Sequence, residues 1–164
     1  PDQFPDFLRW MPGIERIIRY DKVPQTVDKL FAESDTIFCL DFNTPSRITD
    51  ELGENLVAAP GRKVLIDHHL GPDVNTVLTI SHPDMSSTAE LVFRLIHQLG
   101  GYEDMTKNMA VTAYCGMMTD TGGFTFNSTR PEIFLIISLL LAKGIDKDKI
   151  YRNVFNTFSQ RRQQ

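Results

Sequence analysis

The chain has 164 residues, of which 41% are hydrophobic and 23% are charged, and its formal net charge is −4. These values are typical of a globular domain, and the acidic balance argues against a protein that coats long nucleic acid. The longest apolar run, residues 133–142, is too short to span a bilayer, and the first residues show no secretory signal. We therefore expect a cytoplasmic protein without membrane attachment, in which Cys39 and Cys115 stay reduced.

Helices and strands are predicted to alternate along the chain. The first residues are expected to pack irregularly around a short helix over residues 6–11, and Thr26 is suited to cap the next helix, which ends near residue 35. Short apolar runs predict three strands, and glycine, proline and capping residues mark the helix ends. The strands are predicted at 36–40, 63–66 and 77–80, a helix entry at 43–47, and further helices from about residues 88, 106, 131 and 146.

This alternation predicts an α/β fold in which a mostly parallel sheet is flanked by helices. The strands at 36–40 and 63–66 consist almost wholly of apolar residues, which is typical of parallel strands that are buried on both faces. Ligands of such sheets bind at the carboxyl ends of the strands. Residues that directly follow these two strands are therefore the first candidates for a functional site.

Ionisable residues stand at both of these strand ends. Asp41 follows the first strand, and Asp67-His68-His69 follows the central one. Two neighbouring imidazoles on an extended backbone point apart, so we expect one to bind a metal ion and the other a substrate. Asp120 lies in a further polar loop that could converge with them. Mixed carboxylate and imidazole ligands suit Mn²⁺ or another borderline divalent ion, while a purely structural role of these residues at loop starts stays open.

Three further residues have both a functional and a structural interpretation. Arg47 could contact a substrate phosphate, or it could be an exposed helix arginine. Gly122 and Gly123 would let the backbone approach a ligand closely, and they would equally serve the backbone conformation of their loop.

Four other polar residues are best explained by structure. Ser87 and Glu90 form the pattern of reciprocal helix capping. His82 and His97 are expected in a turn and on a helix surface, where an isolated histidine has no ligand partner in the sequence.

Taken together and in this order, the motifs resemble those of the DHH phosphoesterase family, which is named for the tripeptide that stands here as Asp67-His68-His69. The resemblance covers nearly the whole chain and is far more specific than the tripeptide alone. Within the family, the sequence is most similar to bacterial oligoribonucleases that also dephosphorylate 3′-phosphoadenosine 5′-phosphate. The other matching segments are residues 40–47, 86–90 and 119–124.

The resemblance implies a dinuclear Mn²⁺ site, with Mg²⁺ as the alternative ion. In this arrangement Asp41 bridges both ions, and His68 and Asp120 bind one of them. His69 contacts the scissile phosphate, and Asp67 orients a ligating imidazole, as metal-bound histidines generally require. The residues expected on the substrate side are His69, Arg47, Gly122 and Gly123, with His69 and Asp67 as the catalytic residues.

The implied activity is metal-dependent hydrolysis of short oligoribonucleotides and nucleoside 3′,5′-bisphosphates by metal-activated water. Two alternatives keep the same metal site: a pyrophosphatase or polyphosphatase, and a phosphodiesterase acting on substrates related to cyclic dinucleotides. A third is a non-catalytic nucleotide-binding module, although intact acidic and imidazole residues argue against a decayed site. We expect neither long nucleic acid nor membrane as a partner, and formation of a homodimer is left open.

One family motif has no counterpart in the sequence. Family members carry an earlier motif, a histidine followed closely by two aspartates after the first strand, whereas no histidine precedes His68 here. Residues 1–158 are therefore expected to form the catalytic domain without its first strand, and residues 159–164 to begin the linker to a smaller DHH-associated domain. Because three ligands cannot hold two hydrolytic ions, we expect this segment alone to bind metal weakly and to hydrolyse little.

Overall fold

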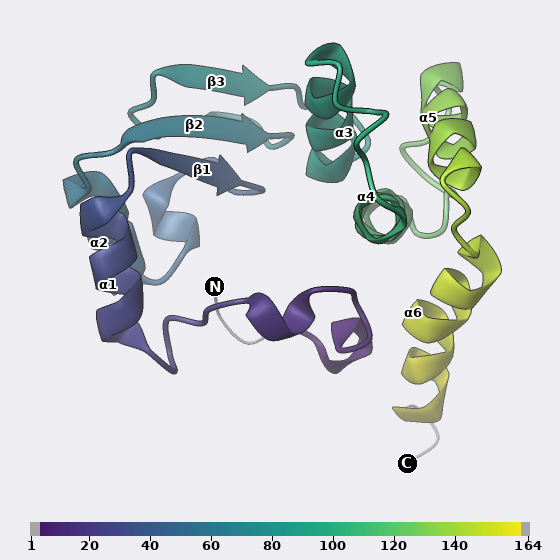
Figure 1. Ribbon diagram of the computed structural model, residues 1–164, viewed down its shortest axis with the longest axis horizontal. Coiled ribbons are helices and arrows are strands. Elements are labelled where there is room, and N and C mark those ends of the chain that lie inside the picture. The colour runs from purple at the N-terminus through teal and green to yellow at the C-terminus, as the bar shows by residue number, and fades with distance from the viewer. Residues whose placement is uncertain (1–3, 162–164) are drawn as a thin grey trace. The chain divides into compact units, whose positions relative to one another are not determined.

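The computed structural model describes the backbone of residues 4–161 and the side chains of residues 4–155 (Figure 1). The chain divides into two compact units, each with its own dense set of internal contacts. Of the described residues, 18–91 belong to unit 1, and 4–17 and 92–161 belong to unit 2.

A three-stranded parallel sheet forms the centre of unit 1. Its strands, in the order β1-β2-β3, are β1 (Thr36–Leu40), β2 (Arg62–Asp67) and β3 (Leu78–Ser81). Both neighbouring pairs are parallel, which confirms the predicted parallel sheet. Leu40 pairs with Ile66, and Ile66 pairs with Ile80. The carboxyl ends of the strands therefore lie at one edge of the sheet.

Two helices of unit 1, α1 (Pro24–Glu33) and α2 (Asp50–Ala58), contribute to the core on one face of this sheet. The centre of that core is a cluster of Cys39 from β1, Leu56 from α2 and Leu65 from β2. Further partly buried side chains pack against the cluster: Phe31, Ile37, Phe42, Ile48 and Val74.

The opposite face of the sheet is only partly covered. Side chains alternate along a strand, so Phe38 and Leu40 project to the face opposite Cys39. Phe38 is 57% exposed and Leu40 is 45% exposed, whereas Val64 and Ile66 on the neighbouring strand are buried. The prediction that strand 36–40 is buried on both faces is therefore wrong, because β1 is an edge strand of the described sheet.

The connection between β1 and β2 also differs from the sequence prediction. The segment 43–47, which was expected to enter a helix, forms a single 3₁₀ turn, η3 (Pro45–Arg47), and Thr44 makes no side-chain cap to it. The α-helix of this connection is α2, which begins at Asp50, later than the predicted entry. Gly53 of α2 packs so closely on η3 that an added Cβ would lie 2.8 Å from the Pro45 carbonyl oxygen, so this contact requires glycine.

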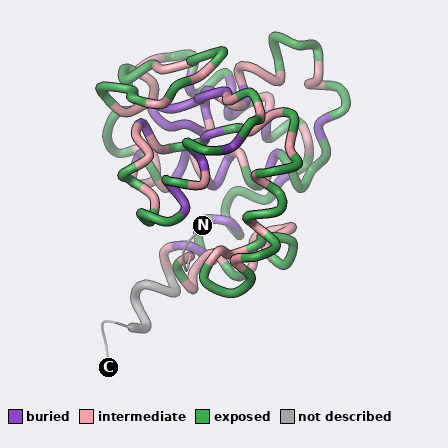
Figure 2. Tube along the Cα trace, turned by 90° about the vertical axis from the view of Figure 1, so that its left-hand side faces the viewer, coloured by how far each residue is buried: buried purple, intermediate pink, exposed green. Residues whose placement is uncertain are grey.

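Unit 2 is helical in its described residues. Its elements are the 3₁₀ turns η1 (Asp6–Leu8) and η2 (Ile14–Arg16), the helices α4 (Lys107–Asp120), α5 (Pro131–Ala142) and α6 (Lys147–Arg161), and the later part of α3 (Thr88–Gln98). Helix α4 packs on α5 and α6, and α6 packs on η1. Buried and exposed residues alternate along the described chain (Figure 2).

Helix α6 runs further than the sequence indicated. Residues 159–161, which were expected to open a linker, belong to this helix, and residues 162–164 lie outside the described residues. Among the helices of the described part of the chain, none is both long and apolar enough to cross a membrane.

A cavity of about 320 Å³ lies within unit 2. Gly123, which follows α4, forms part of its wall, and the ion pair of Lys147 and Asp148 lies at its margin, with Nζ and Oδ1 2.6 Å apart. Most of its lining is aromatic or aliphatic: Tyr114, Met118, Phe124, Phe134, Ile137, Leu141 and Tyr151.

Both cysteines are free and buried, as expected of reduced thiols. Burial raises the pKa of the Cys115 thiol from its ordinary value of 9.0 to about 11. The folded state keeps the proton of this thiol at a pH where the unfolded chain loses it. The contribution of Cys115 to the free energy of unfolding should therefore be constant below pH 9.0 and should decline as pH rises toward about 11. Chemical denaturation across this range would measure the decline, which Cys115→Ala should reduce. An unchanged decline in the Cys115→Ala variant would show that the Cys115 thiol does not cause it.

Candidate metal centre

Asp41 stands at the end of β1 in an uncommon backbone conformation. Its φ of 66° lies in the left-handed region, which aspartate tolerates better than most residues do. Its N–H still donates to the Ile66 carbonyl oxygen at 3.2 Å and so extends the ladder between β1 and β2. The backbone therefore turns at Asp41 while the residue stays anchored to the central strand.

Asp67, the last residue of β2, is fully buried and holds His69. A buried carboxylate is costly unless it is hydrogen-bonded, and both oxygens of Asp67 are bonded. Oδ2 accepts from the His69 backbone N–H at 3.0 Å, and Oδ1 lies 2.7 Å from His69 Nδ1. Because a carboxylate only accepts, Nδ1 of His69 carries a proton, and the lone pair of the neutral ring is on Nε2.

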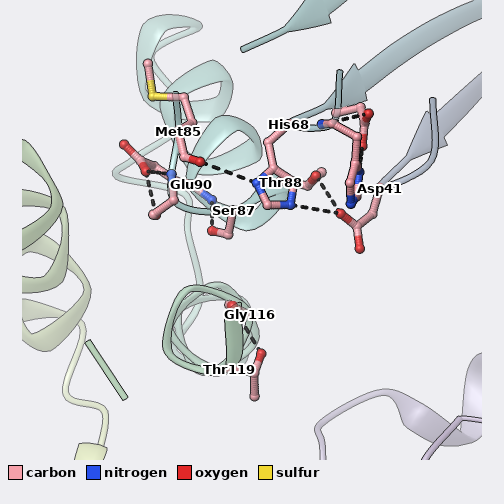
Figure 3. A network of polar contacts seen from close by, with 11 residues as sticks. Asp41, His68, Met85, Ser87, Thr88, Glu90, Gly116 and Thr119 are labelled. Carbon is pink, nitrogen blue, oxygen red and sulfur yellow. Dashed lines mark hydrogen bonds and ion pairs between the residues drawn. The ribbon is translucent and has the colours of Figure 1, made fainter. Parts of the chain in front are cut away.

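His68 is oriented by a backbone carbonyl group instead. Its Nδ1 lies 3.3 Å from the Met85 carbonyl oxygen, in the turn that precedes α3. Since a carbonyl oxygen only accepts, the proton of the neutral ring is again on Nδ1, and Nε2 carries the lone pair. Nε2 of His68 faces Asp41 Oδ1 at 3.7 Å (Figure 3).

Asp41, His68 and His69 form one cluster at the carboxyl edge of the sheet. One donor atom from each lies within 4.8 Å of the other two. The expectation that the two imidazoles point apart is wrong: their ring centroids are 4.7 Å apart, because β2 ends at Asp67 and the chain bends at His69. The imidazole that Asp67 contacts is that of His69, which was predicted to contact the phosphate rather than a metal ion.

The donor set of this cluster fits a borderline divalent ion. One carboxylate and two imidazoles are ligand types that Mn²⁺, Fe²⁺ and Zn²⁺ accept. The separation of 3.7 Å between Asp41 Oδ1 and His68 Nε2 is too long for a hydrogen bond. It is near the spacing of two ligands on one ion, since each lies roughly 2.0–2.2 Å from the metal. The three residues therefore fit a metal ion by ligand type, and Asp41 and His68 fit one ion by spacing as well.

The other predicted site residues lie on separate elements. Arg47 is the last residue of η3 in unit 1 and is exposed. Asp120 is the last residue of α4 in unit 2, so its part in the metal centre stays a prediction. Gly122 and Gly123 follow it with φ values of 55° and 73°, so their left-handed backbone accounts for glycine at both positions.

Several contacts around the cluster were not predicted from the sequence. Met85 contacts His68 through its backbone carbonyl oxygen, and such a contact does not depend on the residue type and so cannot be predicted from the sequence. Residue 88 was predicted only as the start of a helix, yet the Thr88 hydroxyl donates to Asp41 Oδ1. Of the predicted reciprocal capping, the hydrogen bond from the Glu90 N–H to Ser87 Oγ is present, and Glu90 Oε2 also accepts from Ser86.

A buried amide also links the two loops of the site. Asn43, in the loop after β1, donates from side-chain Nδ2 to the Leu70 carbonyl oxygen, and its backbone carbonyl oxygen accepts from the Asp73 N–H at 2.7 Å. The loop that follows Asp41 and the loop that follows His69 are thereby joined. The sequence signal for this link was the asparagine two residues after Asp41. Because asparagine is common in loops, this residue did not stand out as functional.

Fold and cluster together define a class: a parallel α/β domain with carboxylate and imidazole donors gathered at the carboxyl edge of its sheet. A family profile described as "DHH family, N-terminal domain" matches residues 3–117 of the sequence. The chain belongs to the DHH family, which confirms the resemblance noted in its motifs.

Three relatives illustrate the range of similarity. The bifunctional oligoribonuclease and PAP phosphatase NrnA of Thermus thermophilus is 31% identical over 86% of this chain and 39% of its own length. The cyclic-di-AMP phosphodiesterase PdeA of Listeria monocytogenes is 28% identical over 96% of this chain and 25% of its own length. The crystal structure of an exopolyphosphatase-related protein from Bacteroides fragilis is 57% identical, with a TM-score of 0.93 over 95% of this chain and 46% of that one. The chain thus spans less than half the length of each.

The two hydrogen bonds to the histidine rings predict a specific tautomer. We expect the neutral rings of His68 and His69 to carry their proton on Nδ1, because a carbonyl oxygen and a carboxylate accept from that nitrogen. Long-range proton–nitrogen NMR correlations at mildly alkaline pH would identify the protonated nitrogen. The exposed His82 and His97 serve as internal references. A proton on Nε2 of either clustered ring would contradict the described geometry.

Proposed function

We propose that this chain carries the metal centre of a phosphoester hydrolase acting on small nucleotide substrates, namely short oligoribonucleotides and nucleoside 3′,5′-bisphosphates. Mn²⁺ is the proposed ion, with Mg²⁺ as the alternative. The observation that carries the proposal is the convergence of Asp41, His68 and His69 within 4.8 Å, in a chain of the DHH family. Two of the relatives, named as an oligoribonuclease with PAP phosphatase activity and as a cyclic-di-AMP phosphodiesterase, support nucleotides as the substrate class.

The clustered residues would divide the work between ion and substrate. Asp41 and His68 would hold an ion, since Oδ1 and Nε2 face each other at 3.7 Å. His69 would contact the scissile phosphate through Nε2, because its Nδ1 is bonded to Asp67. Asp67 would act by keeping that ring in place. Bound divalent ions would supply the remaining chemistry by lowering the pKa of a water molecule and stabilising charge on the attacking and leaving oxygens.

Unit 1 contributes three donors to the cluster, which suits one ion together with water. We propose that Asp120 of unit 2 binds the same ion as His68 and that Asp41 also reaches a second ion. Arg47 would contact a substrate phosphate from η3, and its exposure leaves it accessible for this contact. Gly122 and Gly123 would let the substrate approach the backbone after α4, where Gly123 already lines a cavity with aromatic walls.

A substitution at the strand end tests the metal centre. Asp41→Asn keeps the shape of the side chain and tolerates its left-handed backbone, but it removes the charge that would attract the ions. In the complete natural polypeptide, we expect Mn²⁺-dependent hydrolysis of short RNA to fall by more than the roughly 10–100-fold that loss of an outer partner of a metal ligand costs. Asp35→Asn, at the other end of β1, is the matched control and should keep the parent rate. Unchanged hydrolysis in Asp41→Asn would rule out the proposed role.

A second candidate function has a specific observation in its favour. The structure that is 57% identical to this chain is described as an exopolyphosphatase-related protein, which favours pyrophosphate or polyphosphate as the substrate. The same metal centre would serve both reactions.

A substrate panel would separate the two candidates. Short oligoribonucleotides, a nucleoside 3′,5′-bisphosphate, a linear dinucleotide, pyrophosphate and polyphosphate would each be incubated with Mn²⁺, with Mg²⁺ and with a chelator. We expect the fastest Mn²⁺-dependent turnover on the nucleotide substrates and none with the chelator. Turnover confined to pyrophosphate or polyphosphate would favour the second candidate, and no turnover on any substrate would favour a binding module. Full turnover by the 164-residue chain alone would contradict its expected low activity.

A further inference from the structure

We propose that Thr88 is a positioning residue for Asp41, whose carboxylate it fixes in the orientation that a metal ion needs. The inference rests on the proposed metal centre and adds to it a residue that touches neither ion nor substrate. Thr88 is the first residue of α3 and is 6% exposed. Its hydroxyl donates to Asp41 Oδ1 at 2.8 Å, from a position 47 residues further along the chain (Figure 3).

Capping of α3 does not explain this hydrogen bond. Hydroxyl residues at helix starts usually accept a backbone N–H from two or three residues further on. In α3 that role belongs to Ser87, whose Oγ accepts from the Glu90 N–H at 3.0 Å. The Thr88 hydroxyl instead donates away from the helix, to the residue that follows β1. The Thr88 hydroxyl therefore bonds a residue of the cluster, Asp41, and not its own helix.

The residues just before Thr88 hold the second member of the cluster. Met85 contacts His68 Nδ1 through its carbonyl oxygen at 3.3 Å. The segment 85–88 thus contacts His68 through its backbone and Asp41 through a side chain. Because one short segment contacts both residues, it can set the distance between them. Loss of the Thr88 hydroxyl would release Asp41 alone and leave His68 in place.

A buried carboxylate holds this segment in shape. Glu90 is fully buried, and its Oε2 accepts from the Ser86 N–H at 2.9 Å and from the Ser86 hydroxyl at 2.6 Å. Hydrogen bonds to a charged acceptor are shorter and stronger than those between neutral groups. Thr88 is therefore presented to Asp41 from a rigid turn, and the position of its hydroxyl is defined before any ion binds.

Asp41 gains from such a restraint because its side chain is largely exposed. The side chain is 57% exposed, whereas that of His68 is 17% exposed. A carboxylate oxygen can accept two hydrogen bonds or bind an ion beside one, so Thr88 can orient Oδ1 without displacing a metal. Removal of comparable outer partners of metal ligands typically weakens metal binding by about 10–100-fold. We expect removal of the Thr88 hydroxyl to weaken metal binding to a similar extent.

Three substitutions at position 88 test the role. Thr88→Val replaces the hydroxyl by a methyl group of similar size, and Thr88→Ala removes it without placing that methyl group beside the carboxylate. In the complete natural polypeptide, Mn²⁺ titration followed by electron paramagnetic resonance should show about 10–100-fold weaker binding for both variants. Thr88→Ser restores a hydroxyl and should bind close to the parent value. Parent-like binding by the valine and alanine variants would overturn the proposal.

A hydroxyl elsewhere in unit 1 provides the control. Thr79 of β3 shares a hydrogen bond of 2.6 Å with Thr76, outside the cluster. Thr79→Val removes a hydroxyl of the same kind and should leave Mn²⁺ binding unchanged. Equal weakening in Thr79→Val and Thr88→Val would assign the effect to general stability and would also overturn the proposal.

Crystal structures of the metal-free variants separate this inference from the proposed function. Thr88→Val or Thr88→Ala should show a rotated Asp41 carboxylate, while Thr88→Ser should keep Oδ1 near 3.7 Å from His68 Nε2. An unmoved carboxylate in the first two would refute the positioning role even where Mn²⁺ binds. A parent protein that binds no Mn²⁺ would instead refute the proposed metal centre, and the crystal structures would still decide the role of Thr88.

Discussion

The parallel pairing of β1 with β2 is the constraint on which the candidate metal centre depends. Leu40 pairs with Ile66, and the Asp41 N–H extends the ladder to the Ile66 carbonyl oxygen. Parallel strands end at the same edge of a sheet, so the residue after β1 meets those at the end of β2 whatever loop connects them. A slip of one residue would turn Asp41 to the other face. Packing of apolar side chains against α1 and α2 therefore determines where a carboxylate meets two imidazoles.

Two buried carboxylates then hold the side chains and backbone of this site in place. Asp67 and Glu90 are both fully buried, a costly state that strong hydrogen bonds must offset. Apolar residues of similar volume would avoid that desolvation, so stability alone does not account for them. Their shared effect is geometric. Asp67 holds the ring and backbone of His69, and Glu90 holds the turn from which Met85 contacts His68.

The sequence predicted what depends on local patterns and missed what depends on where an element stops. Strand 36–40 was placed correctly because polar residues bound its apolar run, and the parallel sheet followed from alternation with helices. Convergence of the His68 and His69 rings was missed because alternation ends with β2 at Asp67. The extent of helix α2 was not predicted, because Gly53 weakens the helical pattern of Leu52 and Leu56. The bond from Thr88 to Asp41 joins distant residues, which no local pattern encodes.

The three clustered donors differ in ways that suit different tasks. Side-chain exposure falls from 57% for Asp41 to 34% for His69 and 17% for His68. A residue shared by two ions needs two donor atoms and access from more than one side. Asp41 meets both needs, because its carboxylate has two oxygens and its side chain is exposed. An imidazole in which one nitrogen is already hydrogen-bonded has only one nitrogen left to bind an ion. His68 and His69 each have Nδ1 bonded within unit 1. This difference supports the proposed division, in which Asp41 bridges the ions while one imidazole binds an ion and the other faces the phosphate.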